Sequence, residues 1–101
     1  DALEDFKKSA EKNESNFRSY YYIGIVLSVM GQEREAFDNF TTSLDLNHYQ
    51  PYVYFRRAQT LYNREFYTEA LADLDKAVSL GFKKDEEKKL RLLIVKKLDI
   101  V

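Results

Sequence analysis

The chain has 101 residues, 45% of them hydrophobic and 33% charged, with a formal net charge of −1 and no cysteine. This size and composition predict one folded domain and argue against a disordered segment, and without cysteine neither a disulfide framework nor a thiolate metal site can exist. The balanced charge is not typical of a nucleic-acid binder, and no apolar run approaches the roughly 20 residues of a membrane span.

Apolar residues that recur every three and four positions predict six helices. In chain order, the expected ranges are 2–12, 17–30, 33–46, 51–63, 67–80 and 85–98. Gly31 and Gly81 are placed to end helices, Pro51 to begin one, and Asn63-Arg64 to form a turn. No stretch alternates apolar and polar residues over the length of a strand, so we expect an all-α fold.

An internal period of 34 residues runs through these predicted helices. Ala2, Ala36 and Ala70 follow one another at that spacing, each with similar neighbours. When residues 17–50 are aligned with 51–84, small residues fall on small ones and apolar residues on apolar ones. A fixed period of this length predicts a repeat array, in which each unit buries its apolar face against the next.

These residues resemble the tetratricopeptide repeat, a 34-residue helix–turn–helix unit. The small positions of that family are filled by Gly24, Ala36 and Ser43, then by Ala58, Ala70 and Ala77. Its large apolar positions are filled by Tyr20, Ile23, Leu27 and Phe40, then by Tyr54, Leu61, Tyr67 and Leu74. The resemblance implies an α-α superhelix, a right-handed solenoid of antiparallel helix pairs.

The same resemblance divides residues 1–101, taken as a single domain, into four parts. These are the second helix of a truncated repeat with its turn (1–16), two full repeats (17–50 and 51–84) and a C-terminal capping helix (85–101). Arg57 takes a place that is usually apolar, and we expect its stem to lie along the interface while its head reaches water. His48 and Phe82 stand where the family often has proline, which implies altered turns between the repeats.

The last predicted helix departs most from the repeat. Asp85 is its expected N-cap, followed by acidic residues that favour the positive end of a helix. Its apolar residues cannot all lie on one face: Leu90, Leu92, Leu93, Ile94, Val95 and Leu98. Two interpretations stay open, a further repeat in a longer protein or a contact with a second chain.

Solenoids of this kind bind extended protein segments along a concave side lined by the first helix of each unit. The positions that the family turns toward this groove are occupied here by Arg18, Tyr21, Tyr22, Ile25, Ser28, Val29, Tyr52, Phe55, Arg56, Gln59, Tyr62 and Asn63. Tyrosines and arginines without an acid suggest a partner peptide that is acidic or carries a terminal carboxylate, with apolar side chains. Alternatively, Tyr21, Tyr22, Tyr52 and Phe55 pack against a neighbouring helix.

Residues that could support catalysis are sparse. His48 is the only histidine and lies in a predicted turn, so we expect neither a metal site nor a nucleophile relay. The acids of the pairs Glu33/Glu35 and Asp73/Asp75 are two residues apart and point to different faces, which indicates solvated convex surface. We therefore expect no enzyme activity, no cofactor and no metal.

The sequence thus predicts a protein-interaction module or scaffold within a longer protein, with a protein or peptide partner. The mixed charges of residues 82–89 form no basic face, so a nucleic-acid partner is not expected. A cytoplasmic location is compatible with the absence of cysteine. Two alternatives stay open: self-association as a homodimer through the apolar last helix or the tyrosine-rich face, and a regulatory domain attached to an enzyme.

Overall fold

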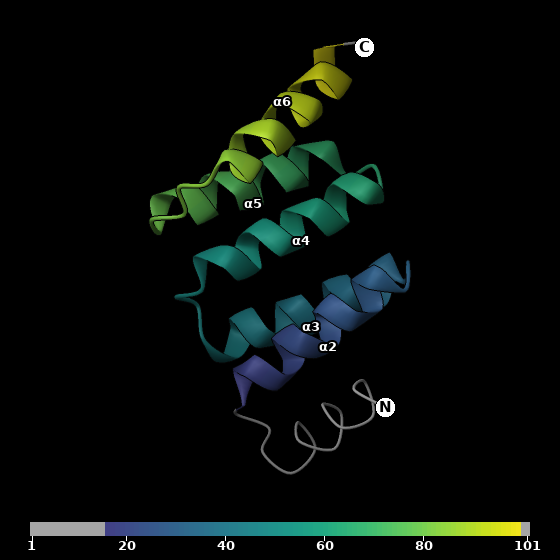
Figure 1. Ribbon diagram of the computed structural model, residues 1–101, viewed down its shortest axis with the longest axis vertical. Coiled ribbons are helices and arrows are strands. Elements are labelled where there is room, and N and C mark those ends of the chain that lie inside the picture. Colours follow the sequence, from purple (N-terminus) through teal and green to yellow (C-terminus); the bar gives the residue numbers. More distant parts are fainter. Residues whose placement is uncertain (1–15, 100–101) are drawn as a thin grey trace.

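The computed structural model describes residues 16–99, which form helices joined by short turns. The helices are α2 (Phe17–Val29), α3 (Glu33–Leu46), α4 (Pro51–Asn63), α5 (Tyr67–Ser79) and α6 (Asp85–Asp99) (Figure 1). Each range agrees with the predicted one to within one residue at either end, and residues 16–99 contain no strand. The predicted helix over 2–12 lies outside the described residues.

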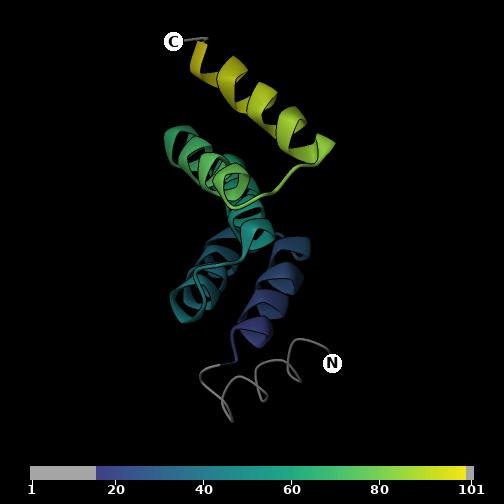
Figure 2. The same cartoon turned by 90° about the vertical axis from the view of Figure 1, so that its left-hand side faces the viewer.

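The helices are stacked as antiparallel pairs. Helices α2 and α3 form one pair and α4 and α5 the next, while α6 covers the second pair. Figure 2, turned by 90°, shows these layers following one another, with α2 and α6 at opposite ends of the described stack. Helix α4 also contacts α2 and α6, so the first helices of the units lie along one side. This is the predicted all-α solenoid of helix pairs.

Left-handed residues end the first helix of each pair. Gly31 follows α2 with φ of 81° and Glu65 follows α4 with φ of 67°, at equivalent places 34 residues apart. The second turn had been predicted at Asn63-Arg64, but α4 runs through Asn63 and the left-handed residue is Glu65. The left-handed conformation costs a non-glycine residue about 1–2 kcal/mol. Turn propensities therefore do not identify Glu65 as the residue that adopts it.

The turns that follow the second helices differ from one another. Asn47 after α3 is extended, with φ of −149°, whereas Gly81 after α5 is left-handed, with φ of 104°. Whether the turns at His48 and Phe82 depart from the usual turn of the family stays a prediction. In the first of these turns, the buried Gln50 donates hydrogen bonds from Nε2 to the carbonyl oxygens of Ser43 (3.0 Å) and Asn47 (2.7 Å). These bonds fix the start of α4.

Small residues lie where the paired helices cross. All six of the predicted small positions are buried: Gly24, Ala36, Ser43, Ala58, Ala70 and Ala77. A Cβ atom on Gly24 would lie 2.5 Å from Cε1 of Phe40, so α2 and α3 approach this closely only because residue 24 has no side chain. Around the crossings, one core cluster centres on Phe40 and another on Leu74, and Tyr54 packs against both. The core is therefore continuous through the stack.

A buried ion pair joins α4 to α5. Nε and Nη2 of Arg57 donate to the two carboxylate oxygens of Asp73 at 2.7 and 2.8 Å, and Nη1 donates to Oγ1 of Thr41 on α3 at 3.2 Å. The two charged side chains are 19% and 10% exposed. The prediction that Asp73 faces solvent was therefore wrong, whereas the side chain of Arg57 keeps part of its exposure to water. Burial lowers the pKa of Arg57, but the hydrogen bonds and charge of Asp73 outweigh it and raise that pKa overall.

The other acids of the supposed convex surface behave differently from Asp73. Glu35 is exposed, as predicted, and Asp75 is largely exposed while forming an ion pair of 2.7 Å with Arg91 of α6. Glu33 is half-buried, and its Oε2 atom is buried without a hydrogen-bond partner, so the prediction of a solvated side chain was wrong there. Its position at the start of α3 places its negative charge at the positive end of that helix.

Helix α6 uses only part of its apolar surface to cover α5. Leu90 and Ile94 are buried, whereas Leu92, Leu93 and Val95 are exposed, which confirms that its apolar residues do not share one face. The helix begins at Asp85 itself, so Asp85 is its first residue and not the predicted N-cap. Acidic residues still fill the first turn, where they favour the positive helix end.

Candidate functional site

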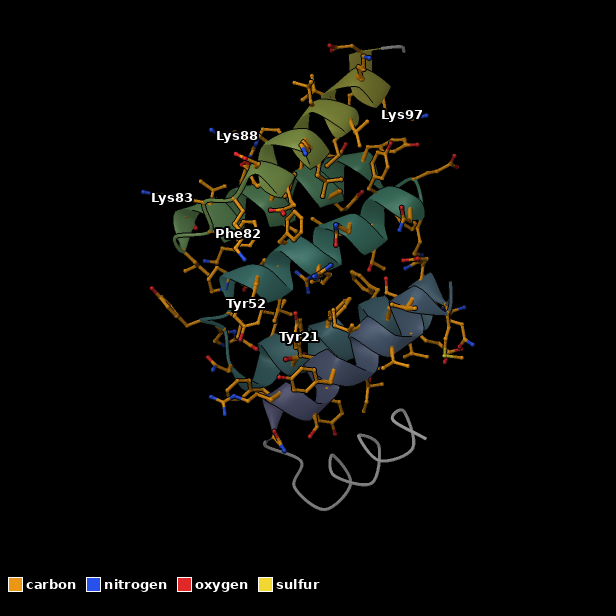
Figure 3. The ribbon with its side chains drawn as sticks, viewed as in Figure 1. Tyr21, Tyr52, Phe82, Lys83, Lys88 and Lys97 are labelled. Carbon is orange, nitrogen blue, oxygen red and sulfur yellow. The ribbon has the colours of Figure 1, made fainter. Side chains whose placement is uncertain are left out.

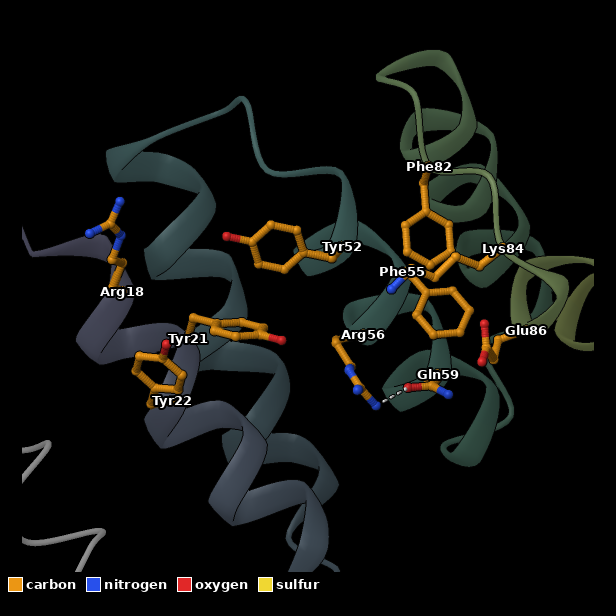
Figure 4. Close-up of a pocket in the computed structure, with 10 residues that line it drawn as sticks. All are labelled: Arg18, Tyr21, Tyr22, Tyr52, Phe55, Arg56, Gln59, Phe82, Lys84 and Glu86. Atoms are coloured by element: carbon orange, nitrogen blue, oxygen red, sulfur yellow. Dashed lines mark hydrogen bonds between the residues drawn. The ribbon is translucent and has the colours of Figure 1, made fainter.

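A hollow of about 550 Å³ opens between α2, α4 and the segment that joins α5 to α6 (Figure 4). Its size falls in the range of ligand-binding clefts. The residues that line it are Arg18, Tyr21, Tyr22, Tyr52, Phe55, Arg56, Gln59, Phe82, Lys84 and Glu86. Helical spacing explains the first seven of these, because residues three and four apart on α2 and on α4 share one helix face.

The structure brings together some of the predicted groove residues and leaves others apart. Those in the hollow are Arg18, Tyr21, Tyr22, Tyr52, Phe55, Arg56 and Gln59. Those that do not line it are Ile25, Ser28, Val29, Tyr62 and Asn63, all in the C-terminal halves of α2 and α4. The hollow follows the N-terminal parts of these helices, because there the α5–α6 segment adds a third wall.

That third wall was missed by the sequence interpretation. Phe82, Lys84 and Glu86 come from the α5–α6 segment and the first turn of α6. Phe82 is buried and stacks on Phe55 with ring centroids 4.7 Å apart. A large aromatic residue directly after a helix-ending glycine was the available signal, since such a residue in a turn usually packs against the preceding element.

Aromatic rings form the floor of the hollow. Tyr21 meets Tyr52 edge-on at 5.3 Å between centroids and Tyr22 at 5.4 Å (Figure 4). Tyr22 and Tyr52 are 46% and 44% exposed, whereas Phe55 is buried. Tyr21 also packs against Phe40 of α3, with ring centroids 6.0 Å apart, so the alternative of packing against a neighbouring helix describes Tyr21. Phe55 is buried against Phe82 of the α5–α6 segment, while Tyr22 and Tyr52 offer apolar ring surface together with a polar hydroxyl group.

Positive charge dominates the side chains around this floor. The lining contains three cationic residues (Arg18, Arg56, Lys84) and one acid, Glu86, hence a local formal charge of +2, against −1 for the whole chain. Arg56 and Lys84 reach into the middle of the hollow, and Arg18 lies at the end beyond Tyr21 (Figure 4). Nη1 of Arg56 donates to Oε1 of Gln59 at 3.3 Å. Glu86 was absent from the predicted set.

His48 is exposed in a bend, in agreement with its predicted place in a turn. Among residues 16–99, no cluster of histidine, cysteine, aspartate and glutamate has the arrangement of a metal site. None of the helices α2 to α6 combines the length and apolarity that crossing a membrane requires.

Comparison with solved structures defines the class of fold. No protein-family model and no curated protein sequence matches the chain. YrrB, described as a TPR protein with an unusual peptide-binding site, superposes with a TM-score of 0.88 at 22% identity over 96% of this chain and 50% of its own. MamA gives a TM-score of 0.89 at 15% identity over 96% of this chain and 57% of its own.

A third structure combines this fold with a bound peptide. SycD, the type III secretion chaperone of Yersinia enterocolitica, was solved in complex with a peptide of the translocator YopD. It superposes with a TM-score of 0.77 at 21% identity over 97% of this chain and 75% of its own. The chain thus spans between half and three quarters of these structures. Its fold is that of tetratricopeptide-repeat proteins, which confirms the resemblance drawn from the sequence.

Proposed function

We propose that this chain is a non-catalytic protein-interaction module that holds an extended segment of a partner protein in the hollow between α2 and α4. The observation that carries the proposal is the pairing of exposed tyrosine surface at Tyr22 and Tyr52 with the cationic head of Arg56. Tyrosine and arginine are among the residue types enriched where proteins bind one another. The peptide-binding descriptions of YrrB and SycD, which share the fold, add support.

The chemistry of the lining points to a partner segment with a carboxylate and apolar side chains. Apolar side chains would cover the rings of Tyr22 and Tyr52, and a carboxylate would accept two hydrogen bonds from the planar guanidinium of Arg56. Glu86 lies at the α6 end of the hollow, whereas the amino group of Lys84 points away from it toward Tyr52 (Figure 4). An acid placed there would be repelled, so we expect the carboxylate of the partner on the α2 and α4 side.

The test replaces the two side chains that would make the main contacts. Peptides first found on an array are titrated against the chain by fluorescence anisotropy, where dissociation constants of about a micromolar would correspond to about −8 kcal/mol. We expect the double variant Tyr22→Ala/Arg56→Ala to weaken binding at least about tenfold, because it removes one aromatic and one charged contact. Its circular dichroism spectrum should remain that of the wild type.

A matched control uses the same residue types away from the hollow. Tyr49, in the turn after α3, and Arg34, on α3, are both exposed, and neither lines the hollow. Tyr49→Ala/Arg34→Ala should leave the affinity unchanged. Equal affinities for the wild type and for Tyr22→Ala/Arg56→Ala would refute the proposed site, and so would a tight homodimer, seen by sedimentation at several concentrations, that covers the hollow.

A further inference from the structure

The outer face of α6 corresponds to a face that is buried in α4. Leu92 and Val95 lie 34 residues after Ala58 and Leu61, the residues through which α4 packs against α5. Ala58 and Leu61 are buried, whereas Leu92 is 69% and Val95 39% exposed. The outer face of α6 is therefore equivalent to the face with which α4 packs against its second helix, α5. No other helix among the described residues covers this face of α6.

The charges of the helices alternate along the stack. The first helices are net basic: α2 has one arginine, α4 two, and α6 five basic against four acidic residues, for formal charges of +1, +2 and +1. The second helices are net acidic: α3 has four acids and one arginine, and α5 three acids and one lysine, for −3 and −2. The basic helices α2 and α4 are thus each covered by an acidic second helix, α3 and α5.

Arg91 on α6 makes one of the two contacts that Arg57 makes at the equivalent position of α4. Arg57, 34 residues earlier, contacts Thr41 of the preceding pair and Asp73 of its own second helix. Arg91 contacts Asp75, the equivalent of Thr41, at 2.7 Å, but its other contact, at 3.1 Å, is Glu87 of α6 itself. Beside Arg91, Glu87 of α6 itself therefore takes the place that Asp73 of the second helix takes beside Arg57.

We propose that the outer face of α6 docks an acidic amphipathic helix of a partner protein, in the way that α5 docks on α4. Close helix crossings here pair a small residue with a large one, as Gly24 pairs with Phe40. In α6 the large residue, Leu92, is on the first helix, so the partner helix presents a small residue opposite Leu92. Its acidic side chains face the lysines that flank Leu92.

Charge favours such a partner over a second copy of α6. Three exposed lysines lie three or four residues from Leu92 and so share its face of α6: Lys88, which Figure 3 labels, Lys89 and Lys96. Two α6 helices packed through Leu92 would bring these lysines together in either orientation, and like charges at an interface cost several kcal/mol. An acidic helix places opposite charges there instead.

The test uses a probe taken from the chain itself. A stapled peptide of residues 66–80 carrying Leu74→Ala is an acidic second helix with a small residue at the crossing, and the staple is needed because an isolated helix of this length is marginal in water. Titrated against the chain by fluorescence anisotropy, it should bind the wild type. Leu92→Lys should weaken binding at least about tenfold. Val29→Lys, at an exposed apolar position on α2, should leave it unchanged.

The requirement for acid and for a small residue is tested with further probes. Replacing Glu69, Asp73 and Asp75 of the probe by glutamine should weaken binding about fivefold in low salt, and less in high salt. The probe that keeps Leu74 should bind more weakly than the Leu74→Ala probe. No binding of the Leu74→Ala probe, or equal binding to the Leu92→Lys and Val29→Lys variants, would overturn the proposal.

Two further experiments test whether the outer face of α6 binds a lipid surface or a second copy of the chain instead. Sedimentation with vesicles of phosphatidylserine and phosphatidylcholine that is lost in Leu92→Lys would overturn the proposal in favour of a lipid surface. A concentration-dependent dimer lost in the same variant would overturn it in favour of a second copy. The Tyr22→Ala/Arg56→Ala variant should bind the helical probe like the wild type, so the outcome here does not depend on the hollow between α2 and α4.

Discussion

The two helix pairs meet the same packing requirement in different ways. In the α2/α3 pair, Gly24 leaves room for the ring of Phe40. In the α4/α5 pair, the equivalent places hold Ala58 and Leu74, and a charged pair between Arg57 and Asp73 is buried beside them. The repeat therefore prescribes a small residue at the crossing, whereas the groups that fill the space around it vary from one pair to the next.

Removing the acid of the buried ion pair should have the largest effect on stability. Asp73→Ala leaves Arg57 largely buried without its counter-ion, and we expect the free energy of unfolding to fall by about 2–4 kcal/mol. Chemical denaturation would measure the loss. Asp75→Ala removes an acid whose side chain is 63% exposed, so as a control it should cost less than about 1 kcal/mol. Equal losses in the two variants would show that the ion pair of Asp73 stabilises the fold no more than the exposed ion pair of Asp75.

Enlarging the small residues of the second helices tests what the pairs have in common. Ala36 and Ala70 are fully buried at equivalent positions. Ala36→Leu and Ala70→Leu should each destabilise the fold by about 1–3 kcal/mol, because the added atoms hold the paired helices apart. Thermal melts would show the change, and a melt without any loss in either variant would count against the helix contact described above.

The smallest effect is expected when the α2/α3 crossing is given the residues of the α4/α5 crossing. Gly24→Ala adds a methyl group against the buried Phe40 ring and should cost about 1 kcal/mol, after the gain of up to about 1 kcal/mol that alanine brings to a helix. Gly24→Ala/Phe40→Leu reproduces the residues of the second pair. We expect the double variant to lose about 1 kcal/mol less than the sum of the single variants, as measured by urea denaturation. Additive losses would contradict a direct contact between these positions.

The sequence was sufficient for the helices and their order because the information is local or periodic. Gly31, Pro51 and Gly81 mark helix ends through backbone conformations that glycine and proline favour. The small residues could be found because Ala36 and Ala70 repeat at a fixed spacing that the two pairs share. The fold class follows from these features together.

The burial of Asp73 could not be predicted from local or periodic information, and the third wall of the hollow only in part, through Phe82 after Gly81. Asp73 looks like a surface acid in its own helix, and only the approach of Arg57, 16 residues away, makes its burial favourable. Phe82 and Lys84 follow the left-handed turn at Gly81 and line the hollow together with residues of α2 and α4, which are distant in the sequence. The binding role of the twelve groove positions stays a prediction.

The contacts of Arg57 also bear on how the stack comes apart. Its guanidinium reaches Thr41 on α3 and Asp73 on α5, so a single side chain connects three successive helices. If α3 or α5 frayed, Arg57 would lose its contact with Thr41 or with Asp73, and its guanidinium would be exposed to water with fewer hydrogen-bond partners. Repeat arrays unfold cooperatively when the coupling between neighbours outweighs the stability of each unit. Arg57 strengthens that coupling, and it thus favours opening of both pairs as one unit in native-state hydrogen exchange.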